Sequence, residues 1–137
     1  MSGLGDTMQI SAVGMQAQAD RLRVVAENIA NADSTASTPG GAPYRRKMVV
    51  FENALNKEMG INTVKVTKRP LDQSPFLKKY EPSNPAADSQ GYVQYPNVNT
   101  IVEMMDMREA RRGYEANLDV ITVSKSMLSQ TIGLLSK

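Results

Sequence analysis

Apolar residues on heptad spacing occupy both ends of this chain, residues 7–31 and 99–136, and this placement constrains the fold most strongly. Steps that alternate between four and three residues keep side chains on one side of an α-helix. The N-terminal seam defined in this way consists of Met8, Ala12, Met15, Ala19, Leu22, Ala26 and Ile29. The C-terminal seam, interrupted by Lys125, consists of Tyr114, Leu118, Ile121, Leu128, Ile132 and Leu135. We expect the two ends to pair as an antiparallel coiled coil.

Each end also carries a second apolar stripe. In the C-terminal stretch this second stripe lies two residues away from the seam, or about 200° around a helix of about 3.6 residues per turn. Its members are Ala116, Val120, Val123, Met127 and Leu134. A weaker N-terminal counterpart, interrupted by Asp20, consists of Ile10, Val13, Ala17 and Val24. One partner helix covers only one side of a helix, so the chain carries more apolar helical surface than one copy can bury. We therefore expect partners from other chains.

The composition indicates an adaptable surface rather than a conventional globule. The chain has 137 residues, which suggests one domain, but no Trp and 9 Met, and methionine packs adaptively against several neighbours. The net charge of +2 does not favour nucleic acid as a partner. No apolar run approaches the roughly 20 residues of a membrane span, and the first residues do not resemble a cleaved secretory signal. We expect export by another route if the protein leaves the cytoplasm.

Local signals predict where the two long helices begin and end. Asp6 with Gln9 has the spacing of a capping box, and Asn31 is suited to end the first helix. Residues 33–43 are small, polar and rich in Gly and Pro, which predicts a loop. Thr100 with Glu103 has the spacing of a second capping box, at the start of a helix of about 37 residues.

The middle of the chain predicts short strands and turns. Residues 48–51 fit either a short strand or the start of a short helix running to Lys57. Residues 63–68 alternate polar and apolar side chains, so we expect a strand that buries Val64 and Val66. Residues 81–91 are rich in turn formers, and residues 92–95 fit another strand that Pro96 ends.

These signals together predict a mainly α fold with a small β-rich insertion. Residues 1–33 and 98–137 would form a discontinuous domain of paired terminal helices, and residues 34–97 would form the loop and insertion.

The residues that carry most enzyme chemistry are missing. The chain has no His and no Cys, which excludes the commonest general base, the usual zinc ligands, thiol nucleophiles and disulfides. Glu103, Asp106 and Glu109 share one helix face, but we interpret them as a solvated face that pairs with nearby arginines rather than as a metal site. Those arginines are Arg108, Arg111 and Arg112. We predict no catalytic, cofactor or metal site and no small-molecule substrate.

Short basic clusters at residues 45–47 and 78–79 are interpreted as solvated ends of turns or strands. Other functions stay open at this point. The chain could form a self-contained helical hairpin, or act as another kind of coiled-coil assembly or adaptor protein. A nucleic-acid-binding helical protein would place Arg108, Arg111 and Arg112 on phosphates, although the near-neutral charge argues against it. A hydrolase acting through carboxylates or Ser would need a concave pocket, which a thin pair of helices does not favour.

Four segments resemble the flagellar basal-body rod proteins, within the axial proteins of the bacterial flagellum. They are AENIANADST at 26–35, STPGGAPYRRK at 37–47, GYVQYPNVN at 91–99 and RGYEANLDV at 112–120. The stretched second segment is similar to that of one proximal rod member. The motif residues are Asn28, Asn31, Tyr44, Arg45, Arg46, Gly91, Tyr92, Tyr95, Pro96, Asn97, Asn99, Tyr114, Glu115, Ala116 and Asn117.

This resemblance implies a structural subunit of the proximal rod. Such a subunit assembles through its terminal helices into a helical tube, part of the drive shaft and export channel that crosses the periplasm. It is exported by the flagellar type III apparatus without a cleaved signal peptide. The implied partners are copies of itself, other proximal and distal rod proteins, the membrane-anchored ring and the export gate. The resemblance implies no enzyme activity, cofactor, nucleic acid or small-molecule substrate.

Overall fold

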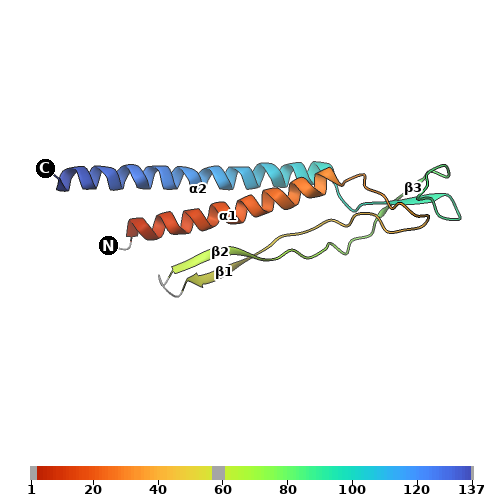
Figure 1. The fold of residues 1–137 in the computed structure, drawn as a ribbon, viewed down its shortest axis with the longest axis horizontal. Helices are drawn as coiled ribbons and strands as arrows, with labels where there is room; N and C mark the ends of the chain where they lie inside the picture. Colours follow the sequence, from red (N-terminus) through yellow and green to blue (C-terminus); the bar gives the residue numbers. More distant parts are fainter. Residues whose placement is uncertain (1–2, 57–60, 137) are drawn as a thin grey trace. The chain divides into compact units, whose positions relative to one another are not determined.

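The chain is mainly helical, and two small antiparallel sheets come between the two long helices in the sequence (Figure 1). The computed structural model describes residues 3–56 and 61–136. The elements are α1 (Gly3–Ala30), β1 (Val50–Asn56), β2 (Ile61–Lys68), β3 (Leu77–Tyr80), β4 (Tyr92–Tyr95) and α2 (Thr100–Leu135). The predicted class, mainly α with a small β insertion, is therefore confirmed. None of the helices in the described residues is long and apolar enough to cross a membrane.

The chain divides into two compact units. Unit 1 consists of Met1–Leu22, Val50–Lys68 and Arg108–Lys137, and unit 2 consists of Arg23–Val49 and Arg69–Met107. Each long helix contributes residues to both units. The domain division expected from the sequence, with residues 34–97 as a separate insertion, stays a prediction.

The start of α1 differs from the prediction. The helix begins at Gly3, so Asp6 lies in its first turn and the capping box predicted at Asp6 is wrong. A carboxylate in this first turn still stabilises the helix, because it lies near the positive end of the helix dipole. The predicted end at Asn31 is confirmed. The Asn31 backbone and side-chain amides both donate to the Glu27 carbonyl, at 3.1 and 2.9 Å.

The start of α2 is capped by Asn99 rather than by Thr100. Asn99 Oδ1 accepts hydrogen bonds from the backbone N–H groups of Ile101 and Val102, at 3.1 and 3.3 Å. Glu103, the predicted partner of Thr100 in a capping box, is fully buried and bonds to Arg46 instead. The predicted helix length of about 37 residues agrees with the 36 residues of α2.

In unit 1, β1 and β2 form an antiparallel pair in which Glu52 lies opposite Lys65. The strand alternative for residues 48–51 is thus confirmed from Val50 onward, and Lys57 lies outside the described residues. The prediction that β2 buries both Val64 and Val66 is wrong. Val64 is 40% exposed and Val66 is half-buried, whereas Thr63 is buried. Thr63 points to the opposite face of the strand from Val64 and Val66, and a sheet of only two strands buries little of either face.

In unit 2, β3 and β4 form a second antiparallel pair, with Leu77 opposite Tyr95 and Tyr80 opposite Tyr92. The sequence predicted β4 at its observed bounds but did not predict β3. Gly91, just before β4, has a φ of +86°, and a β-carbon there would lie 2.8 Å from the Tyr80 ring. Glycine is therefore required at this turn. Val93 on β4 is fully buried and belongs to the small core of unit 2.

Candidate functional site

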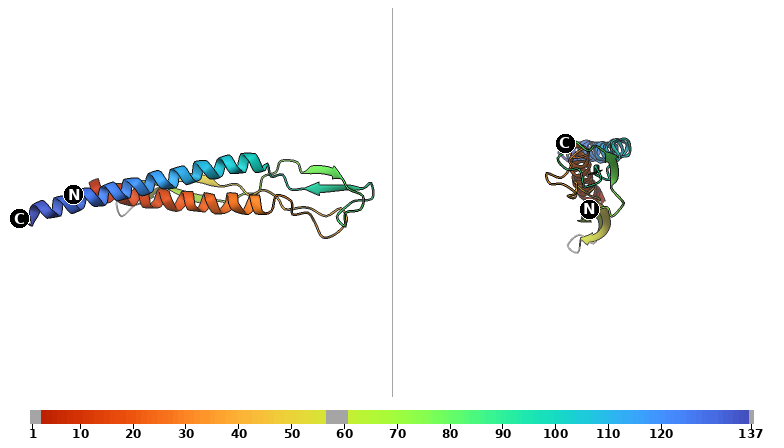
Figure 2. Two further views of the ribbon diagram at one scale, coloured as in Figure 1. Left: turned by 90° about the horizontal axis from the view of Figure 1, so that it is seen from above. Right: turned by 90° about the vertical axis from the view of Figure 1, so that its right-hand side faces the viewer.

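The α1 and α2 segments of unit 1 lie side by side and antiparallel (Figures 1 and 2). A β-carbon added to Gly14 would meet the Asn117 side chain, and one added to Gly113 would meet Gln18. Further along, Arg21 forms an ion pair with Glu109 at 3.4 Å. The residue numbers rise along α1 while those of the partners fall along α2, which defines the antiparallel direction.

The residues buried in the unit 1 parts of these helices are small. They are Ser11 and Ala17 on α1 and Ala110 and Ser124 on α2. Ala110 is completely inaccessible to solvent, and the other three are at most 5% exposed. Small side chains let two helices approach closely, but they bury little apolar area per residue. The helix pair in unit 1 therefore gains little from hydrophobic burial within one copy.

The large apolar residues of the C-terminal seam lie mostly outside this buried set. Tyr114 and Ile121 are half-buried. The exposed members of the seam are Leu118 (43% exposed), Leu128 (43%), Ile132 (58%) and Leu135 (81%). The second C-terminal stripe is exposed throughout, at Ala116, Val120 (40%), Val123 (57%), Met127 (53%) and Leu134 (76%). A single copy thus leaves most of the predicted C-terminal assembly surface in contact with solvent.

The N-terminal seam is more mixed. Ala12 and Ala26 are exposed, and the half-buried members are Met8, Met15, Ala19, Leu22 and Ile29. In the second N-terminal stripe, Ile10 is 42% exposed, whereas Ala17 and Val24 are buried. The buried residues of α1, Ala17 and Val24 among them, therefore lie off the predicted seam. The heptad pattern located the apolar surface, but it did not identify the face that meets α2.

Unit 2 is organised around Asn28, which is fully buried at the end of α1. Its Oδ1 accepts hydrogen bonds from the Tyr44 hydroxyl at 2.7 Å and from the Lys47 backbone N–H at 2.9 Å. Its Nδ2 donates to the Lys47 carbonyl at 2.8 Å and to the Glu103 carboxylate at 3.4 Å. One side chain thus joins α1, the segment around residues 44–47 and the start of α2.

Arg46 is the second centre of this polar cluster. Its guanidinium donates to Glu103 through Nε and to Asp72 through Nη1, the latter at 3.2 Å, and its Nη2 lies 3.7 Å from Asp106. The Arg46 backbone N–H donates to Asn97 Oδ1 at 2.8 Å. Because the Glu103 side chain is only 1% exposed, Arg46 compensates a buried negative charge.

The basic residues on either side of Arg46 are also engaged. Lys47 pairs with Glu27, and Arg45 Nη1 donates to the Asp72 carbonyl at 2.8 Å. The Arg45 guanidinium also stacks over the Phe76 ring, 4.1 Å from its centroid. The interpretation of residues 45–47 as a solvated turn is therefore wrong, because all three side chains bind other segments of unit 2.

Burial and hydrogen bonding perturb the protonation of several groups in this cluster. Burial, with the nearby charges of Glu27 and Glu103, raises the pKa of Tyr44 to about 12. Burial alone would lower the pKa of Arg46, but the bonds and charges of Glu103 and Asp72 outweigh it and raise that pKa. Hydrogen bonds from Ser74, with the bond and charge of Arg46, lower the pKa of Asp72. The cluster thus favours a charged Asp72, a charged Arg46 and a neutral Tyr44.

The three acidic residues at the start of α2 pair with cations from other segments. Glu103 and Asp106 face Arg46, and Glu109 faces Arg21. The prediction that Glu103 lies on a solvated face is wrong, because Glu103 is fully buried. No group of three or more potential metal-ligating residues lies close enough to hold an ion within residues 3–56 and 61–136.

The motif residues fall into four groups. Asn28, Tyr44, Arg45, Arg46 and Asn97 meet in the unit 2 cluster. Gly91, Tyr92, Tyr95 and Pro96 lie on or next to β4, while Asn31 ends α1 and Asn99 caps α2. Tyr114, Glu115, Ala116 and Asn117 lie on α2 in unit 1, where Asn117 meets α1. The motif residues did not include Asp72, and the burial of Glu103 was not predicted. A single acidic residue gives no sequence signal that it pairs with an arginine distant in the chain.

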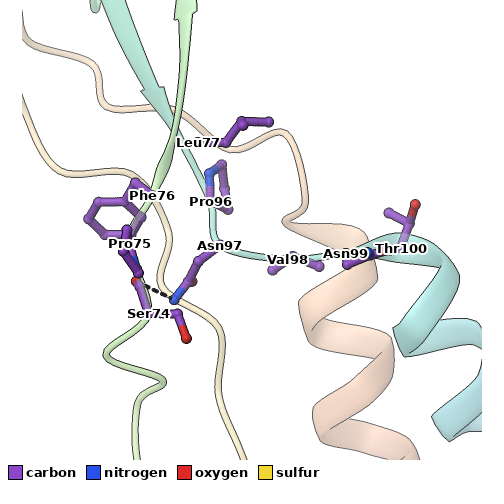
Figure 3. A pocket seen from close by; sticks show the side chains of 9 residues that line it. All are labelled: Ser74, Pro75, Phe76, Leu77, Pro96, Asn97, Val98, Asn99 and Thr100. Carbon is purple, nitrogen blue, oxygen red and sulfur yellow. Dashed lines mark hydrogen bonds between the residues drawn. The ribbon is translucent and has the colours of Figure 1, made fainter.

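An open groove of about 510 Å³ lies beside this cluster, between residues 74–77 and 96–100 (Figure 3). Asn97 Nδ2 crosses it to donate to the Ser74 carbonyl at 3.1 Å. None of the nine lining residues carries a charge. The groove therefore offers hydroxyl groups at Ser74 and Thr100 but no charged side chain among its lining residues to act as a general acid or base.

Comparison with known proteins identifies relatives along the whole chain. Residues 8–36 match the family model described as flagella basal body rod protein, and residues 89–134 match that of the flagellar basal body rod FlgEFG protein C-terminal region. The relatives include several proteins named flagellar basal-body rod protein FlgC. The Agrobacterium fabrum protein is 49% identical over 98% of this chain and 97% of its own length. The Borreliella burgdorferi protein is 39% identical over 97% of this chain and 98% of its own length. The Salmonella typhimurium protein is 42% identical over 91% of this chain and 92% of its own length.

Proposed function

We propose, on the premise that this chain belongs to the FlgC family of flagellar basal-body rod proteins, that it is a structural subunit of the proximal rod. In this role the subunit assembles with copies of itself and with other rod proteins through its terminal helices. The product is a helical tube that forms part of the drive shaft and export channel.

The observation that carries this proposal is the solvent exposure of large apolar side chains on α2. Leu118, Val123, Met127 and Ile132 are each more than two-fifths exposed, and Ala110 and Ser124 occupy buried positions instead. Leaving apolar surface in water is unfavourable by about 25 cal/mol for each Å². Covering these side chains with neighbouring helices would therefore supply a driving force for assembly that folding of one copy does not use.

The arrangement of the exposed residues favours a filament. The C-terminal seam and its second stripe lie on nearly opposite sides of α2, so one helix can meet two neighbours at once. A contact that joins two different surfaces of identical subunits adds copies without limit unless rotation closes a ring. Such heterologous contacts produce a tube when each subunit also has lateral neighbours.

The relatives' names support a location in the flagellar basal body. Within it, we infer a position in the part of the rod that crosses the periplasm, after export through the flagellar type III apparatus. The partners in this proposal are copies of the chain, other proximal rod proteins, the distal rod, the membrane-anchored ring and the export gate. The unit 2 cluster has a structural role in it, because Asn28 and Arg46 use their polar groups to join segments of the same chain.

The proposal is tested by placing a charge on the exposed seam. Leu118→Asp puts a carboxylate where a neighbouring helix would bury the leucine, and burying an unpaired charge is strongly unfavourable. In cells that lack their own copy of the protein, we expect this variant to accumulate normally, to be absent from isolated basal bodies and to leave the cells non-motile.

The matched control is Ser126→Asp, which adds the same charge at an exposed α2 position outside both stripes. This variant should enter the basal body and support swimming. Normal motility with Leu118→Asp would contradict the assignment of the seam, and loss of both variants from the cell would point to instability instead.

A further inference from the structure

Two glycines in unit 1 face amide side chains from the opposite helix. A β-carbon on Gly14 of α1 would lie 2.9 Å from Asn117 Nδ2, closer than real side chains approach. A β-carbon on Gly113 of α2 would lie 3.1 Å from Gln18 Nε2. On each helix the glycine precedes the amide by four residues, which is about one turn. Each helix thus offers one notch and inserts one side chain into the notch of its partner.

We propose that these four residues, Gly14, Gln18, Gly113 and Asn117, form a register lock. The lock fixes the position of α1 along α2, and with it the alignment of the apolar residues that the two helices leave exposed. The inference rests on the proposed function only for the use of that alignment in assembly.

The geometry specifies one register because neighbouring registers lose the fit. A slip of about 5.4 Å, one helical turn, in one direction brings Asn117 against Gln18, so that two amides compete for one space. The same slip in the other direction brings Asn117 against Ile10 and sets Gly113 opposite Gly14, which leaves a void between two residues without side chains. Either slip replaces complementary contacts with a clash or a gap.

Hydrogen bonding ties the two halves of the lock together. Asn117 Nδ2 donates to the Gly113 carbonyl at 2.9 Å. The side chain that fills the Gly14 notch is therefore held by the residue that forms the second notch. Because this bond lies within α2, it restricts the rotamers of Asn117 independently of α1. Pairing of the helices therefore costs less side-chain entropy at Asn117.

Gln18 indicates that the lock serves specificity more than stability. Its Oε1 is buried and has no hydrogen-bond partner within the part of the chain that the structure describes. A buried acceptor without a partner is destabilising, so an apolar side chain would stabilise the pair more. Single polar residues inside coiled coils fix register at a similar cost.

Alanine substitution at the glycines tests the lock, because the lock should reverse the sign of the change in melting temperature. Alanine normally stabilises a helix relative to glycine. Gly5→Ala on α1 and Gly133→Ala on α2, where no atom lies within 4 Å of the added carbon, should leave the melting temperature unchanged or raise it by about 1 to 3 °C. Gly14→Ala should instead lower it by about 3 to 5 °C, because the methyl group displaces the Asn117 amide from its notch. Gly113→Ala should lack the rise seen with the two controls, because its methyl group displaces the Gln18 amide.

Paired substitutions distinguish a lock from general loss of packing. Asn117→Ala added to Gly14→Ala empties the space that the new methyl group needs, so most of the lost melting temperature should return. Gln18→Ala added to Gly14→Ala relieves no clash and should not restore it. The reciprocal rescue is Gln18→Ala in the Gly113→Ala chain. A rise in melting temperature with Gly14→Ala equal to that of Gly5→Ala, or equal rescue by both partners, would overturn the proposal.

Register itself can be read from spin labels, because the sequence contains no cysteine. Gln9→Cys with Thr122→Cys labels two exposed positions, one on each helix. We expect one narrow distance distribution in the otherwise unchanged chain and a shifted or broadened one with Gly14→Ala. An unchanged distribution would refute the lock. A shifted register with normal basal-body assembly would uphold the lock and reject its role in alignment, whereas the Leu118→Asp result tests the proposed function separately.

Discussion

The two units of this chain share the same two helices but differ in the kind of side chain that they bury. Unit 2 buries charged and amide groups and satisfies them internally, with Asn28 and Arg46 bonding to several segments each. Unit 1 buries small residues and leaves large apolar side chains in solvent. The difference indicates that unit 2 is specified by polar contacts within one copy, whereas unit 1 leaves apolar surface that neighbouring subunits would cover in the proposed assembly.

The largest expected effect is the loss of the Arg46 side chain. Arg46→Ala leaves the buried Glu103 carboxylate without its cation, and breaking a buried ion pair in this way costs about 3 to 5 kcal/mol of unfolding free energy. Tyrosine fluorescence during urea unfolding should report the loss, since Tyr44, Tyr80, Tyr92 and Tyr95 belong to unit 2.

The matched control for Arg46→Ala is Arg112→Ala, which removes an exposed arginine and should change the unfolding free energy by no more than about 0.5 kcal/mol. A loss below about 1 kcal/mol for Arg46→Ala would mean that unit 2 does not depend on its polar cluster, and the contrast with unit 1 would fail.

A smaller effect is expected from alkaline titration of Tyr44. Its folded-state pKa is about 12, above the ordinary value of 10.0, so folding favours the protonated hydroxyl. This contribution is complete below about pH 10 and disappears as the pH rises toward about 12. Unfolding measured at a series of alkaline pH values should therefore show a decline in stability that Tyr44→Phe reduces. If stability declined equally with pH in the two proteins, ionisation of Tyr44 would not be the cause of the decline.

The smallest expected effect lies on the outer face of unit 1. Met127 is 53% exposed, so Met127→Gln should change the stability of the isolated chain by at most about 0.5 kcal/mol while weakening assembly. Ala110→Gln, at a fully buried position of the same helix, should cost about 1 to 3 kcal/mol. If Met127→Gln proved as destabilising as Ala110→Gln, the outer face would be part of the fold of one copy.

Periodic signals in the sequence predicted the long elements well. The heptads, Asn31 and Pro96 located α1, α2 and β4 closely, because helix periodicity and chain-breaking residues act locally. The sequence did not predict β3, whose four residues are all exposed and carry no alternation. It also placed Val64 rather than Thr63 inside, since alternation gives two faces of a strand without saying which one is covered.

The candidate site was only partly predictable for a similar reason. Apolar spacing located exposed apolar residues, but the face between α1 and α2 in unit 1 consists largely of Gly, Ala, Ser and amide residues, which periodicity in hydrophobicity does not detect. In unit 2, the motif contained Asn28 and Arg46, yet their partners Asp72 and Glu103 are distant in the chain. Contacts of this kind depend on the folded path of the backbone and not on local sequence.

The way in which Asn28 holds the segment after Tyr44 has an evolutionary consequence. Its carboxamide binds both the N–H and the carbonyl of Lys47, as a neighbouring strand would, and so recognises the peptide unit rather than the side chain. Apart from the ion pair with Glu27, the structure therefore places little constraint on the side chain at position 47. Proline is the exception, because it has no backbone N–H to donate. Position 28 has no such latitude, because glutamine, the other carboxamide side chain, is one methylene longer and would not meet both groups in the same geometry.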